Sequence, residues 1–156
     1  MTANRFFEVQ LPPLLATICM TGCGGLYDAK VTGTVSLDNQ PLSRGTVAFN
    51  PADRGPAGYS MIDRYGKYAV MTGREQGLPS GDYTVTVVAN EPPATQWNEQ
   101  GGPPPPGKPI TPPWYRTKQT SGLKYKVNPG RNQINLKLYT EPPSGWKAPK
   151  KRTLRR

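Results

Sequence analysis

Two cysteines, Cys19 and Cys23, stand four residues apart and are the only cysteines of the chain. Side chains at this spacing can meet on one helix face, where they could bind a metal, form a disulfide or act as a nucleophile. Zinc takes four ligands, and the chain has no histidine to complete a site with two thiolates. A disulfide would close a very small loop inside an apolar run, and a catalytic cysteine needs a nearby base or cation. These three chemistries therefore fit the pair poorly.

The residues around the cysteines predict export and lipidation. Residues 11–22, LPPLLATICMTG, hold an apolar run of about ten residues, which is too short for a membrane-spanning helix but typical of a signal-peptide core. The small residues before Cys23 resemble the bacterial lipoprotein box, although methionine stands where that box usually has leucine. The resemblance implies that the chain is cleaved after residue 22 and that Cys23 carries acyl chains such as palmitate.

Processing at this box would divide the N-terminus into a signal peptide over 1–22 and a flexible tether over 23–29. Cys19 would leave with the leader and Cys23 would be blocked, so the mature chain would have no free thiol, which suits an oxidising compartment. We therefore expect a cell-envelope protein that is anchored in a membrane by lipid and faces the periplasm or the cell surface. An uncleaved apolar N-terminus is the alternative interpretation.

The body of the chain alternates apolar and polar residues with period two, which is typical of strands with one buried face. Turn residues separate the runs: Asp38 and Asn39 follow the first, a turn over 63–66 contains a glycine, and 128–130 reads Asn-Pro-Gly within a predicted closing hairpin over 123–139. We expect a single all-β sandwich of about seven strands. The side chains expected to face inward are Val31, Gly33, Val35, Leu37, Val47, Phe49, Tyr83, Val85, Val87, Leu123, Tyr125, Val127, Ile134, Leu136 and Leu138.

Four stretches of the body resemble carboxypeptidase regulatory-like domains, which have a transthyretin-like or immunoglobulin-like sandwich. They read VTGTVSLDNQPLSRGTVAFNP, DRYGKYAV, LPSGDYTVTVV and PPWYRTKQTSGLKYKVNPGRNQINLKL, and the match runs from Lys30 to Leu138. The resemblance implies a domain over 30–140 of the kind found in small bacterial lipoproteins. Asn39 stands where the family usually has glycine, but asparagine also tolerates positive φ.

An insertion over 91–113 interrupts this resemblance. It reads EPPATQWNEQGGPPPPGKPITPP, with nine prolines in 23 residues, and such a composition favours polyproline II or disorder. The insertion lies between two predicted strands, so we expect it to leave the sandwich as a loop. One interpretation is a surface spacer. The other is a recognition loop in which Trp97, Trp114 and Tyr115 contact a glycan or a peptide.

The net charge of +10 is concentrated at the C-terminus. The expected disordered tail over 141–156 contains six cations near its end: Lys147, Lys150, Lys151, Arg152, Arg155 and Arg156. This tail could contact an anionic envelope polymer or lipid headgroups, or it could be a solvated terminus. Nucleic acid is not expected as a partner, because no aromatic residues alternate with these cations as single-strand binders require.

No enzyme, metal site or cofactor is expected. The chain lacks histidine, the commonest general base, and Asp38, Asp53, Asp63 and Asp82 are scattered over predicted turns. The sequence therefore predicts a non-enzymatic, lipid-anchored envelope protein with a structural, adhesive or docking sandwich. The alternative function is a glycan- or peptide-binding module of the envelope that uses the tryptophans and the proline-rich loop.

Overall fold

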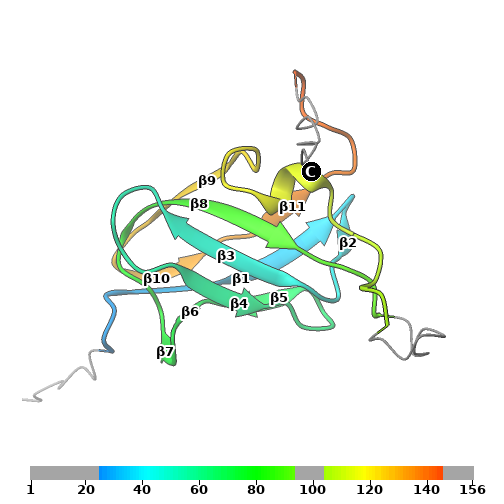
Figure 1. The fold of residues 1–156 in the computed structure, drawn as a ribbon. Coiled ribbons are helices and arrows are strands. Elements are labelled where there is room, and N and C mark those ends of the chain that lie inside the picture. The colour runs from blue at the N-terminus through cyan, green and yellow to red at the C-terminus, as the bar shows by residue number, and fades with distance from the viewer. Residues whose placement is uncertain (1–24, 94–103, 146–156) are drawn as a thin grey trace, which may run out of the picture.

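Strands make up the regular structure of the chain, as the alternating pattern predicts. The computed structural model describes residues 25–93 and 104–145, and within these ranges it contains eleven strands, one short 3₁₀ helix and no α-helix (Figure 1). The strands form one sheet of five and one of six. The all-β sandwich is therefore confirmed. The expected seven strands were too few, because three of the eleven span only two residues each.

The five-stranded sheet is built around the long strand β1 (Ala29–Leu37). On one side β1 pairs in parallel with two consecutive strands of the C-terminal segment, and on the other side it pairs antiparallel with two short strands. The parallel neighbours are β10 (Gly130–Gln133) and β11 (Leu136–Leu138), and the antiparallel ones are β2 (Gln40–Pro41) and β5 (Lys67–Ala69).

The six-stranded sheet is antiparallel throughout, and β8 and β3 lie near its centre (Figure 1). Its strands, in spatial order, are β7 (Glu75–Gln76), β6 (Met71–Thr72), β4 (Gly58–Met61), β3 (Thr46–Pro51), β8 (Gly81–Val88) and β9 (Leu123–Val127).

The core lies between the two sheets and contains most of the side chains that the alternation predicts. Val31 and Val35 of β1 face Val47 and Phe49 of β3, and all four side chains are at most 1% exposed. The Phe49 ring packs at 6.1 Å from the ring of Tyr68, a distance typical of tilted aromatic pairs. Burial of these apolar side chains from both sheets is the main source of stability of the sandwich.

Two local predictions concern turns. Asp38 and Asn39 have φ angles of 48° and 66°, so asparagine does take the left-handed conformation at this turn. Gly66 has φ +78° in the turn over 63–66, but the strands that this turn joins, β4 and β5, belong to different sheets. Asp82, expected at a turn, lies within β8.

The predicted hairpin over 123–139 is wrong. β9 pairs with β8 in the six-stranded sheet, whereas β10 and β11 pair with β1 in the other sheet. The turn over 128–130 therefore carries the chain from one layer to the other. Both runs alternate with period two, and alternation does not reveal which partner a strand takes.

The base of the 91–113 insertion packs on the sandwich. The amide of Glu91 donates to the carbonyl of Lys108 over 2.8 Å, and the amide of Ile110 donates to Ala89 over 2.9 Å. Thr111 is 1% exposed, and its hydroxyl accepts a hydrogen bond from the amide of Ala89. The prediction that the whole insertion leaves the sandwich is therefore wrong for residues 108–113. In the described ranges no helix is long and apolar enough to cross a membrane.

Candidate functional site

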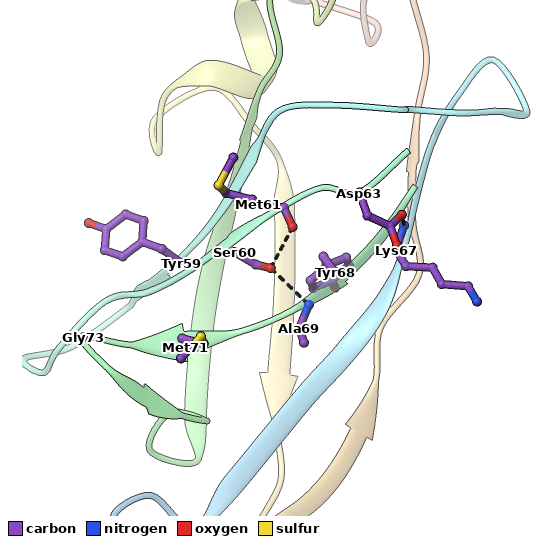
Figure 2. Close-up of a pocket in the computed structure, with 9 residues that line it drawn as sticks. All are labelled: Tyr59, Ser60, Met61, Asp63, Lys67, Tyr68, Ala69, Met71 and Gly73. Carbon is purple, nitrogen blue, oxygen red and sulfur yellow. Dashed lines mark hydrogen bonds between the residues drawn. The ribbon is translucent and has the colours of Figure 1, made fainter. Parts of the chain in front are cut away.

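A groove of about 850 Å³ opens where the chain crosses between the two sheets. Strand β4 belongs to the six-stranded sheet, β5 to the five-stranded sheet, and β6 again to the six-stranded sheet. Figure 2 shows the residues of these three strands and of the adjoining turns that line the groove, among them Tyr59, Met61 and Met71. We call these three side chains the apolar row.

The strand register brings the apolar row together. Tyr59 is paired with Met71 of β6 on one side and with Ala48 of β3 on the other. Met61 lies two residues along β4, on the same outward face as Tyr59. The side chains of Tyr59, Met61 and Met71 are 53%, 82% and 42% exposed, so three large apolar side chains face solvent beside one another.

Ser60 fixes the opening of the groove. Its hydroxyl donates to the carbonyl of Met61 and accepts a hydrogen bond from the amide of Ala69, both at 3.0 Å (Figure 2). This second bond ties β4 to β5 across the gap between the sheets. The Ser60 hydroxyl thus serves the backbone, and its proton points to a carbonyl rather than to a base.

The turn that closes one end of the groove is held by Asp63. Its Oδ1 accepts hydrogen bonds from the amides of Tyr65 and Lys67, both at 2.8 Å. An aspartate that accepts bonds from the amides of its own turn is a common structural element. Asp63 therefore shapes the rim of the groove.

Tyr68 forms the floor of the groove and is 5% exposed. Its hydroxyl donates to the carbonyl of Ile134 over 2.6 Å. Burial, with a smaller contribution from the nearby Tyr125, raises the pKa of Tyr68 well above its usual range. The phenol therefore stays protonated at neutral pH and supports the groove as a fixed donor.

A second groove, of about 760 Å³, lies near the end of β11 and is lined in part by Asp38, Tyr115 and Tyr139. The carboxylate of Asp38 accepts hydrogen bonds from the amide and the hydroxyl of Thr140 at 3.1 and 2.8 Å. The hydroxyl of Tyr115 accepts one from the amide of Tyr139 at 3.1 Å. The Asp38 carboxylate and the Tyr115 hydroxyl, which line the second groove, thus hold the segment after β11. Among the described residues, no group of three or more acidic, cysteine or histidine side chains could hold a metal ion.

Trp114 and Tyr115 are both buried, although Tyr115 also lines the second groove. They belong to the 3₁₀ helix η1 (Pro113–Arg116), and each is 6% exposed. Their rings pack 5.9 Å apart within the hydrophobic core, and η1 packs against β8. The expectation that Trp114 offers a flat face to a glycan or a peptide is therefore not met, and a ligand contact by Tyr115 stays a prediction. The helical turn directs both side chains onto the sandwich, which the proline-rich composition does not reveal.

The other predicted site residues lie outside the described residues. They are Cys23, Trp97 and the tail cations Lys147, Lys150, Lys151, Arg152, Arg155 and Arg156. Lipidation at Cys23 and an anionic contact of the tail stay predictions.

The amino-acid pattern does not mark the apolar row as a site. The stretch GYSMI, residues 58–62, alternates so that Tyr59 and Met61 share one face of a strand. The opposite face of this run holds Gly58, Ser60 and Ile62, so the period-two pattern alone does not decide which face turns inward. In the structure Gly58 is buried, and its surroundings leave no room for a side chain, because a Cβ there would come within 2.5 Å of Val70. Close packing at this glycine turns Tyr59 and Met61 to solvent.

Comparisons with family models, curated proteins and solved structures give no match for this chain. The resemblance to carboxypeptidase regulatory-like domains therefore stays a prediction. The two-sheet sandwich and the apolar row are the findings on which a function can be argued.

Proposed function

We propose that this chain is a non-enzymatic cell-envelope protein that is anchored by acyl chains on Cys23 and docks a protein partner on its sandwich. The observation that carries the docking is the apolar row of Tyr59, Met61 and Met71 beside the groove. A group of exposed, adjacent apolar side chains marks an interaction site on a soluble domain. Tyrosine and methionine are also enriched at the centres of protein interfaces.

The chemistry of the row favours a protein partner with apolar side chains. Met61 and Met71 flank Tyr59, and methionine adapts its shape to irregular apolar surfaces. A glycan- or peptide-binding module built on the Trp114 ring loses support, because that ring is buried in the core.

Strand pairing and hydrogen bonds hold the backbone around the row, which favours binding with little ordering cost. Strands β4 and β3 are paired over four residues, and Ser60 ties β4 to β5. A partner would therefore meet a preformed surface and would spend little of its binding energy on ordering it.

Support for the anchor comes from the sequence. The apolar run ends at Cys23, and β1 begins at Ala29, so a short tether would join the acylated residue to the sandwich. The resemblance of the body to domains found in small bacterial lipoproteins agrees with this arrangement.

Site-specific photocrosslinking in intact cells tests the docking. A benzophenone amino acid replaces Met61 in one strain and Lys124 in another, because both are exposed positions on the outer face of the six-stranded sheet. We expect a discrete, heavier adduct from position 61 only, and the double substitution Tyr59→Ser and Met71→Ser should remove it. Equal adducts from both positions, or none from position 61, would refute a partner at the apolar row.

A further inference from the structure

The outer face of the five-stranded sheet carries cations on four of its strands. Partners in a strand ladder point to the same side of a sheet, and in this ladder Lys30 is paired with Arg131, Thr34 with Lys67, and Ser36 with Lys137. We call the four exposed cations on this side the basic face: Lys30, Lys67, Arg131 and Lys137.

Hydroxyl and amide groups fill the space between these cations. Thr32, Thr34 and Gln133 are exposed on the same side, and the side chain of Asn135 accepts hydrogen bonds from Thr34. From Lys30 to the level of Lys137 the strand advances six residues, which is about 20 Å. The face therefore offers cations towards both ends of β1 and neutral polar groups between them.

Acidic side chains lie only at the rim of this face. Within the described ranges no strand of the five-stranded sheet carries an acid, and the nearest ones, Asp28, Asp38 and Asp63, precede or follow its strands. Each of these carboxylates accepts two hydrogen bonds. Asp28 accepts them from Ser80 and Asp38 from Thr140. Asp63 accepts them from the amides of residues 65 and 67. They are held in turns and do not pair with the cations of the face.

The outer face of the other sheet has a different character. Its cations Lys124 and Lys126 lie on β9, and Lys126 is paired in register with Asp82. The same face also carries the apolar row. The two layers of the sandwich thus present opposite chemistries, one cationic and polar and the other apolar with mixed charge.

We propose that the basic face seats the sandwich on an anionic lipid bilayer and turns the apolar row away from it. This inference rests on the proposed function, because the anchor sets the distance. Ala29 is the sixth residue after Cys23, and a chain of that length reaches at most about 20 Å. Lys30, the second residue of β1, and its ladder partner Arg131 in β10 then lie at the anchored end of the sheet.

A bilayer fits this face better than a soluble anionic polymer. Four exposed cations on one side of a sheet can approach the phosphate groups of a bilayer surface together. Each cation contributes when it comes within a Debye length of that surface, about 8 Å at physiological salt. A single polymer chain is better held in a groove, and Lys30 and Arg131 line neither of the two grooves described above, whereas Lys67 lines the first and Lys137 the second.

Vesicle binding of the full chain with Cys23→Ala tests the inference without acyl chains. Partition onto phosphatidylcholine vesicles is measured with and without phosphatidylglycerol, so that the neutral vesicles report any contribution of the apolar leader. The test variant is Lys30→Gln with Arg131→Gln, and the matched control is Lys124→Gln with Lys126→Gln on the opposite sheet. Leader and basic tail are common to all variants. A second test pair, Lys67→Gln with Lys137→Gln, guards against a folding defect in the first.

Each test pair should weaken partition onto the anionic vesicles about 20-fold, and the control pair should change it less than about threefold. Equal losses in test and control pairs would mean that only net charge matters and would overturn the inference. No loss of partition in either test pair would also overturn the inference. The same holds if the test pairs lose binding to soluble dextran sulfate but keep their partition onto the anionic vesicles. These variants carry no acyl chain, so vesicle binding tests the basic face separately from the anchor. Vesicle binding can fail while the wild-type chain is acylated at Cys23, and it can succeed while the wild-type chain is not acylated.

Discussion

The Tyr68 hydroxyl donates to the carbonyl oxygen of Ile134 over 2.6 Å, which joins the strands on the two sides of β1. Gly33 of β1 lies beneath this bond, and a Cβ there would come within 1.8 Å of the same oxygen. The absence of a side chain at Gly33 thus lets Tyr68 reach across the central strand. Because Tyr68 is also the floor of the groove, this bond couples the groove to the core.

Tyr68→Phe should lower the free energy of unfolding by about 1–3 kcal/mol, because the carbonyl of Ile134 would lose its phenol donor in a buried setting. Chemical denaturation measures the change. Tyr65→Phe is the matched control, since the Tyr65 side chain is exposed, and it should leave the unfolding midpoint unchanged. Equal midpoints for wild type and Tyr68→Phe would contradict the structural role of this bond.

Gly33→Ala should destabilise the sandwich by at least about 1–3 kcal/mol, because the new methyl group would collide with the backbone of Ile134. Thr32→Ala, at the exposed neighbouring position, should change stability by less than about 0.5 kcal/mol. Thermal unfolding of the two variants compares them directly. A Gly33→Ala variant as stable as Thr32→Ala would show that β1 and the Ile134 segment are farther apart than described.

Trp114→Ala should cost about 3–5 kcal/mol of stability, as expected for an aromatic side chain removed from a core. Tyr59→Ala, which removes an exposed ring of the apolar row, should leave stability nearly unchanged. Denaturant titration of both variants separates a core role from a surface role. If Trp114→Ala were neutral, the ring would have to be exposed, as the sequence alone suggested.

The lowered pKa of the Asp28 carboxyl leads us to expect that the free energy of unfolding depends on pH. The Asp28 carboxylate accepts bonds from the hydroxyl and the amide of Ser80, and these bonds lower its pKa below the usual value of about 3.9. A carboxyl whose pKa is lower in the folded state stabilises the fold above the unfolded pKa and loses that contribution as the pH falls through the folded pKa.

The stability difference between wild type and Asp28→Asn should therefore be present at neutral pH and shrink below about pH 4. Unfolding curves recorded across that pH range measure it. A difference that persists unchanged in acid would indicate that the carboxylate charge does not matter at this position.

The sequence predicts the sandwich well because alternation records which side chains face the core. Val35, Phe49, Val85 and Leu136 follow the pattern closely, and each is buried. Alternation does not predict which strands pair with one another. The runs of β9 and of β10 with β11 alternate equally well, but they join different sheets, and only the tertiary fit decides between these pairings.

The candidate surfaces depend on those pairings, so the sequence could not predict them. Lys30 and Arg131 are 101 residues apart in the chain and become neighbours only through the parallel register of β1 and β10. Tyr59 and Met71 likewise meet through the pairing of β4 with β6. Trp114 shows the opposite error, since a tryptophan beside a proline-rich stretch looked accessible and is a core residue.

The intact mass of the protein purified from the envelope tests the central claim most directly, with a Cys23→Ala variant measured in parallel. The account predicts a mature chain that begins at Cys23 and carries the added mass of acyl chains, and this form should be lost in the variant. An unmodified chain that begins at Met1 would contradict the anchored docking protein.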